Sequence, residues 1–153
     1  LMVNNIRVTL RCFVLGLSFG IGTVAMLFFN GAIMGAIAAN FASWGQSLDF
    51  WAMILPHGVP EIFAILLGGG GGLILADALL RPGRRSRSEA LRERGLRALT
   101  LVTATVPLLM LAGLIEAFIT PLQSVPPSAK LTFAACLLLG LSTWLRAPWL
   151  KDE

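Results

Sequence analysis

The sequence FWAMILPHGVPEIFAILLGGGGGLILADALL, residues 50–80, decides what kind of protein this is. The stretch is apolar almost throughout, yet it carries three ionisable side chains, His57, Glu61 and Asp77. As one straight helix it would rise about 46 Å, whereas the hydrocarbon core of a bilayer is about 30 Å thick. Because a proline inside a helix removes a hydrogen bond and clashes with the preceding turn, we expect a break at 56–60. A short interfacial segment would then precede a spanning helix over 61–80.

The composition excludes a soluble domain. Apolar residues make up 56% of the 153 residues and charged residues only 13%, and several apolar runs are long enough to cross a bilayer. We therefore predict an all-α, polytopic transmembrane bundle of four to five helices, forming one membrane domain over 1–153. The expected helices cover about 8–29, a short 31–44, 50–80 broken at 56–60, 98–119 and 130–149.

Residues 31–44 are ambiguous. Asn30-Gly31 is typical of a turn, and the fourteen residues that follow are few for a helix that crosses a bilayer. The segment is therefore either a re-entrant or interfacial piece, or a short crossing packed inside the bundle. The first arrangement leaves the N-terminal residues in the cytoplasm, and the second places them outside.

Glycines recur at helical spacing in the apolar segments. In a membrane, small residues four apart let two helix backbones approach closely. The run over 68–72 could instead be a linker or a local unwinding that exposes carbonyls to a cavity, but its leucine and isoleucine neighbours favour helix packing. The predicted packing positions are Gly16, Gly20, Gly31, Gly35, Gly68 and Gly72.

A basic loop is predicted over 81–97. Its seven arginines and two glutamates give a net charge of 7 − 2 = +5, and loops this basic stay in the cytoplasm. Membrane topology therefore explains the basic character better than nucleic-acid binding does. Attraction to the anionic lipid bilayer is the favoured role, with docking of a cytoplasmic partner as the alternative. Asp77 is expected to pair with Arg81 four residues on, and the arginines of the loop are Arg81, Arg84, Arg85, Arg87, Arg92, Arg94 and Arg97.

With that loop inside, a polar cluster is predicted at the outer membrane level. It comprises His57, Glu61 and Glu116, with Asn30 at a similar depth. Ionisable groups at membrane depth are costly and are usually paired or functional. A structural clamp, in which Glu116 pairs with His57 or caps a neighbouring helix, is favoured over a metal or catalytic site and over an ion or proton path. Zinc is the cofactor that this set could hold, but we expect none, because no complete catalytic or metal motif is present.

The ordered motifs resemble those of a known family. Asn4-Asn5, Asn30-Gly31 with Gly35, Pro56-His57-Gly58 followed by Glu61, and Ile115-Glu116-Ala-Phe together resemble the stage II sporulation protein M family of bacterial and archaeal membrane proteins. The resemblance covers most of the chain. Because the family usually has a further helix upstream, it implies that the chain lacks one, that Asn4-Asn5 lie outside and that 31–44 cross the membrane.

The resemblance also implies a function. The founding member of the family is linked with peptidoglycan-degrading partners, as the membrane anchor of a hydrolase complex. We therefore expect a non-enzymatic, multi-pass scaffold of the cytoplasmic membrane that holds cell-envelope proteins or a second copy of itself. The alternatives are a transporter for a small solute or ion, or an intramembrane metal-dependent enzyme that uses His57, Glu61 and Glu116.

Overall fold

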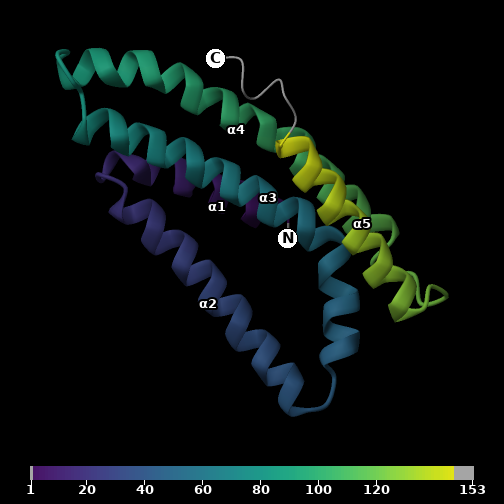
Figure 1. Cartoon of the computed structure of the whole chain (residues 1–153). Coiled ribbons are helices and arrows are strands. Elements are labelled where there is room, and N and C mark those ends of the chain that lie inside the picture. Colours follow the sequence, from purple (N-terminus) through teal and green to yellow (C-terminus); the bar gives the residue numbers. More distant parts are fainter. Residues whose placement is uncertain (1, 147–153) are drawn as a thin grey trace.

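The structure is a computed structural model that describes residues 2–146. Within this range every regular element is a helix, and short turns and loops connect them (Figure 1). Four of its helices are long and apolar enough to cross a membrane. This confirms the predicted all-α membrane bundle. The elements are α1 (Met2–Val14), a short 3-10 turn η1 (Leu15–Leu17), α2 (Ile21–Ser43), α3 (Ser47–Leu80), α4 (Arg87–Phe118) and α5 (Pro127–Leu145).

Helix α3 is the centre of the bundle, because every other helix packs against it. It runs antiparallel to α4, and the two lie side by side along most of their length (Figure 1). Ala64 of α3 forms the apolar core with Leu108 and Leu109 of α4. Further along, a side chain at Gly71 would lie 2.9 Å from the carbonyl oxygen of Ala98. The small residues of α3 therefore let α4 approach its backbone closely.

Helix α1 packs on a second small-residue face of α3, and it runs parallel to α3. A methyl group added at Gly68 would lie 2.8 Å from the carbonyl oxygen of Thr9, and one added at Gly16 would clash with the backbone of Gly72. One turn later, Gly20 lies against Ala76. The glycine run over 68–72 is thus part of a continuous helix that α1, α2 and α4 all touch, and it is neither a linker nor an unwound segment.

The predicted helix over 8–29 is wrong, because the chain reverses at Ser18–Gly20. Gly20 has a φ of 85° and Phe19 a φ of 56°, so both adopt the left-handed conformation that ends a helix. The predicted turn at Asn30-Gly31 is also wrong, because no helix ends there. The Asn30 side chain donates a hydrogen bond to the carbonyl of Met26 one turn back, and α2 continues through this point to Ser43. The short helix is therefore α1, and 31–44 belong to a full-length apolar helix.

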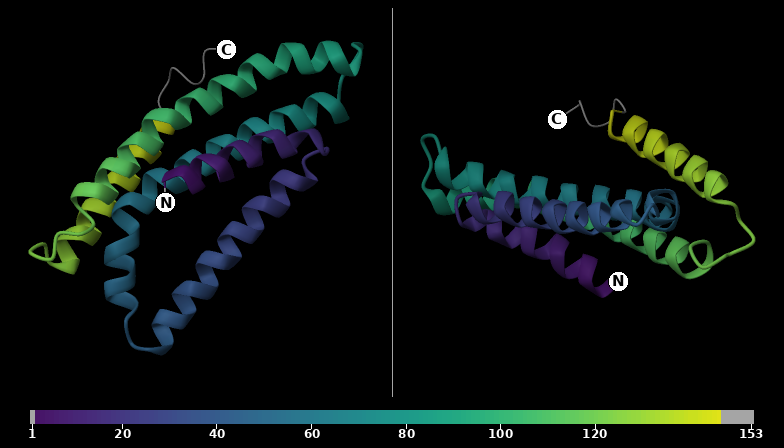
Figure 2. Two further views of the ribbon diagram at one scale, coloured as in Figure 1. Left: turned by 180° about the vertical axis from the view of Figure 1, so that it is seen from behind. Right: turned by 90° about the horizontal axis from the view of Figure 1, so that it is seen from below.

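Two other predicted boundaries also change. Pro56 and Pro60 both lie inside α3, so the expected turn between two separate segments is a bend in one helix, visible in Figures 1 and 2. The predicted basic loop shortens to 81–86, because the Ser86 hydroxyl and the Glu89 carboxylate form a capping box that starts α4 at Arg87. Helix α5 begins three residues before the predicted 130, and Trp149 lies outside the described residues.

Helix α2 leans away from α3 beyond its first turns (Figure 2). Residues 31–37 are exposed on every face of the helix, and no atom of residues 2–146 lies within 4 Å of a Cβ added at Gly31 or Gly35. Within the described part of the chain, these two predicted packing glycines are therefore not used for packing. The far end of α2 is held by aromatic contacts, in which Phe41 stacks on Phe50 of α3 with ring centroids 4.8 Å apart.

We expect Gly72→Ala to destabilise the protein, because the new methyl group would meet the Cys12 carbonyl and lie 2.8 Å from the Thr23 hydroxyl. Overpacking of this kind costs about 1–3 kcal/mol. Gly140→Ala is the matched control, since nothing lies within 4 Å of that position on α5 and alanine favours a helix by up to about 1 kcal/mol. Thermal unfolding in detergent should show a lower midpoint for Gly72→Ala alone. Equal midpoints would contradict the close contact between α1 and α3.

Candidate functional site

The bend in α3 places a buried histidine against the end of α4. His57 is only 4% exposed, and its Nδ1 lies 3.1 Å from the Thr120 hydroxyl oxygen. That hydroxyl also lies 3.3 Å from the Ile115 carbonyl oxygen, to which it can donate. A hydroxyl that donates to Ile115 accepts from His57, and the imidazole then carries its proton on Nδ1. The burial of this polar ring is thus compensated by a hydrogen bond, as buried polar groups require.

Helix α5 is attached to the same point. The Lys130 ammonium donates a hydrogen bond of 2.8 Å to the Thr120 carbonyl oxygen. Because this carbonyl belongs to the turn that ends α4, the bond also satisfies a backbone group left unpaired at a helix end. The end of α4 is therefore tied to α3 through the Thr120 side chain and to α5 through its carbonyl.

Two carboxylates complete the cluster. Glu61 lies one turn after His57 on α3, is partly buried, and lies near the Asn5 side chain of α1. Glu116 of α4 lies close enough to both His57 and Glu61 for their charges to interact. Four helices therefore meet at one end of the bundle, which we call the histidine end, through the side chains of Asn5, His57, Glu61, Glu116, Thr120 and Lys130.

Glu61 and Glu116 lie near His57, and the predicted role of these three residues as one site stays a prediction. The expected partner of His57 is different: Thr120, rather than Glu116, makes the hydrogen bond. Asn30 does not join the cluster, since its side chain bonds within α2. Among residues 2–146, no group of three or more histidine, cysteine or acidic side chains is arranged to hold a metal ion. The zinc set considered for His57, Glu61 and Glu116 is therefore not formed in the described part of the chain.

Sequence reasoning missed three members of the cluster. Thr120 had a detectable signal, because it lies four residues after Glu116 and so on the same side of the chain. Asn5 also had one, because the resemblance places Asn4-Asn5 on the outer side with the predicted cluster, whereas the position of Lys130 depends on how α5 docks on α3 and α4.

The opposite end of the bundle, which we call the arginine end, holds a second charged network. Asp77 is 3.6 Å from the Arg81 guanidinium Nε, as the sequence predicts, and it also pairs with Arg94 of α4. Arg94 donates a further bond of 3.0 Å to the Arg81 carbonyl oxygen, and Arg85 pairs with Glu93. The loop 81–86 is therefore fastened to the start of α4.

The two polar ends are about one bilayer apart. Asp77 and His57 are twenty residues apart on α3, which corresponds to about 30 Å of helix. This matches the thickness of the hydrocarbon core. The apolar part of the bundle between the arginine end and the histidine end thus has the length that a bilayer requires.

Four apolar helices of spanning length, packed in one bundle, define a polytopic membrane protein. A family model described as Stage II sporulation protein M matches residues 1–121, and the chain belongs to this family. An uncharacterized protein of the archaeon Methanocaldococcus jannaschii is 28% identical over 123 residues, which is 79% of this chain and 69% of that protein. No solved structure matches the chain.

We expect Thr120→Val to lower the free energy of unfolding by about 1–3 kcal/mol, because it leaves the buried His57 ring without its hydrogen-bond partner. Thr103→Val is the matched control, since that exposed hydroxyl bonds only to the Thr100 carbonyl of its own helix. Thermal unfolding of the two variants in the same detergent gives the comparison. If both variants unfold at the same temperature, the His57–Thr120 bond does not stabilise the histidine end.

Proposed function

We propose that the protein is a non-enzymatic scaffold of the cytoplasmic membrane, which holds a second copy of itself or envelope proteins through α2. Membership of the stage II sporulation protein M family supports a membrane protein of that family. The observation that carries the scaffold role is the difference between the two sets of glycines. The glycines of α3 contact α1 and α4, whereas Gly31 and Gly35 of α2 are open.

The open surface of α2 has the properties of a helix-docking surface in a membrane. Its glycines are four residues apart, so they lie on one side of the helix and allow a partner backbone to approach. The apolar side chains beside them, including Ile33 and Ile37, are 61% and 44% exposed. A lipid-facing helix needs no glycines on its surface, whereas a helix that binds another helix gains van der Waals contact from them.

The basic character of the arginine end supports its orientation toward the cytoplasm. The histidine end then faces outward, where envelope partners would bind. In this proposal the hydrogen bonds between His57, Thr120 and Lys130 have a structural role: they hold the ends of α3, α4 and α5 in fixed positions.

The test compares the size of the assembly before and after the open glycines are filled. We expect the full chain, extracted from its membrane with a mild detergent and cross-linked, to run as a complex larger than one copy. The double variant Gly31→Ile and Gly35→Ile should lose most of that complex, because the added side chains prevent close backbone approach. Gly140→Ile on α5 is the control and should retain it.

Mass spectrometry of the complex shows whether it contains a second copy or other envelope proteins. Recovery of a single copy free of protein partners, unchanged in both variants, would contradict the scaffold proposal. The scaffold proposal is also contradicted if the double variant at Gly31 and Gly35 folds and assembles normally but loses an enzymatic or transport activity.

A further inference from the structure

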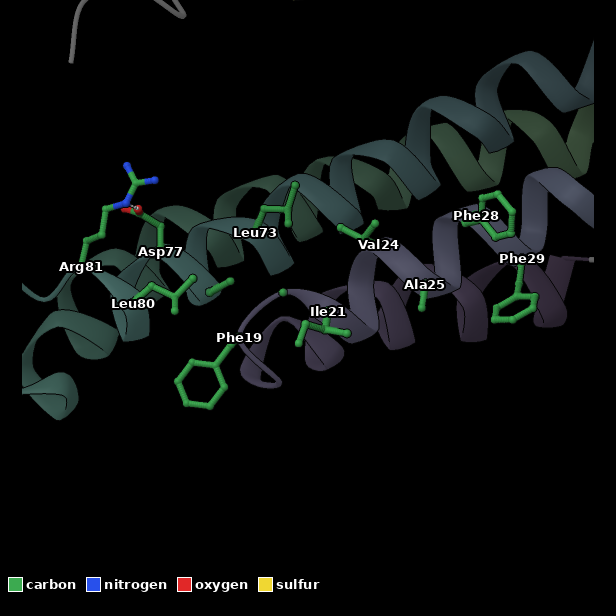
Figure 3. Close-up of a pocket in the computed structure, with 12 residues that line it drawn as sticks. Phe19, Ile21, Val24, Ala25, Phe28, Phe29, Leu73, Asp77, Leu80 and Arg81 are labelled. Carbon is green, nitrogen blue, oxygen red and sulfur yellow. Dashed lines mark ion pairs between the residues drawn. The ribbon is translucent and has the colours of Figure 1, made fainter.

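An apolar groove lies at the arginine end, between the first turns of α2 and the last turns of α3. Its volume is about 690 Å³, and its walls are formed by residues of 19–29 and of 73–81 (Figure 3). Phe19, Leu80 and Leu73 are among the side chains that face it, and all three are at least 44% exposed. The groove is separate from the polar cluster at the histidine end and from the open glycines of α2.

The depth of the groove corresponds to one leaflet of a bilayer. Its wall on α2 extends from Ile21 to Phe29, and its wall on α3 from Leu73 to Arg81. Each wall therefore rises about 12 Å along its helix. Half of a hydrocarbon core is about 15 Å. The groove thus begins among the charged residues of the arginine end and ends near the middle of the membrane.

The mouth of the groove carries basic side chains. Arg81 lines it, with a side chain that is 85% exposed, and Arg84 follows three residues later in the loop. Asp77 also lines the mouth, but its carboxylate is already paired with Arg94 and with Arg81. The positive end of the α2 dipole and the negative end of the α3 dipole meet at this point and offset each other, so the positive charge comes from the arginine side chains. An occupant with a negatively charged head and an apolar tail matches this arrangement.

We propose that this groove binds an anionic phospholipid of the surrounding bilayer, with one acyl chain between α2 and α3 and the phosphate at Arg81 and Arg84. Arginine is suited to this role because its planar guanidinium can donate two parallel hydrogen bonds to a phosphate. The apolar walls explain why the acyl chain enters, and the arginines explain why the lipid is anionic. The lipid joins α2 to α3 where the two helices diverge.

A second copy of the chain fits the groove less well. A symmetric contact would place two copies of the same arginine loop at the same membrane level. Like charges brought together in this way oppose association. A lipid phosphate at the same position would instead compensate the charge.

The experiment uses the full chain in liposomes that contain either phosphatidylglycerol or phosphatidylcholine with a photoactivatable group on the acyl chain. Irradiation followed by peptide mass spectrometry locates the labelled residues. We expect phosphatidylglycerol to label the two groove walls well above the level reached by phosphatidylcholine. Arg81→Gln should reduce that labelling about fivefold, as expected for one arginine near an anionic headgroup. Arg92→Gln, which lies outside the groove, should leave it unchanged.

Ala25→Trp supplies an independent test, because it fills the groove without changing charge, and Ala32→Trp further along α2 is its matched control. Loss of groove labelling in Ala25→Trp alone supports the proposal. Equal labelling by both lipids, or labelling that Arg81→Gln does not reduce, would overturn it, and so would cross-links from the groove to a second copy. If Ala25→Trp does not fold, the comparison of the two lipids on the wild type and on Arg81→Gln decides the outcome.

Discussion

Close contact between the backbones of α1 and α3 is the constraint on which the rest of this structure depends. In a membrane the hydrophobic effect does not drive helices together, so van der Waals contact and hydrogen bonds must do so. Gly16 and Gly72 remove the side chains that would separate α1 from α3. The buried Thr23 hydroxyl then reaches the Cys12 carbonyl at 2.7 Å and ties the start of α2 to α1. The turn at Gly20, the direction of α2 and the position of Asn5 beside Glu61 all follow from this contact.

Two networks of polar and charged side chains join the helices at opposite ends of the bundle, and their separation links the fold to the bilayer. At the arginine end, Asp77 joins α3 to α4 through Arg94. At the histidine end, Thr120 joins α3 to α4 through His57, and Lys130 adds α5. About 30 Å of apolar helix separates these networks. The register that pairs α3 with α4 therefore also gives the bundle an apolar length equal to the thickness of the hydrocarbon core. The proposed lipid and scaffold sites both use what is left exposed, namely the first turns of α2 and its middle.

Composition and periodicity were sufficient to predict the class of fold, because apolar runs of this length have few other structures available to them. A similar depth for His57, Glu61 and Glu116 was also expected from the sequence, since antiparallel helices joined by a short loop bring equivalent depths together. The helix ends around Gly20 and Asn30 were not predictable. Asn30-Gly31 has the composition of a turn, but the Asn30 amide bonds back to Met26 and α2 continues. The real turn depends on the left-handed backbone of Phe19 and Gly20, which local sequence does not distinguish from a packing glycine. Likewise, prolines at 56 and 60 predict an interruption, and whether it is a turn or a bend depends on how α4 and α5 pack around it.

Oxidative cross-linking of introduced cysteines tests the parallel packing of α1 on α3 most directly. The background is the full chain with Cys12→Ser and Cys136→Ser, in its native membrane. Parallel packing predicts that Asn5→Cys forms a disulfide with Glu61→Cys at the histidine end and does not form one with Asp77→Cys at the arginine end. A disulfide between positions 5 and 77, with none between 5 and 61, would show that α1 runs the other way and would contradict the structure described above.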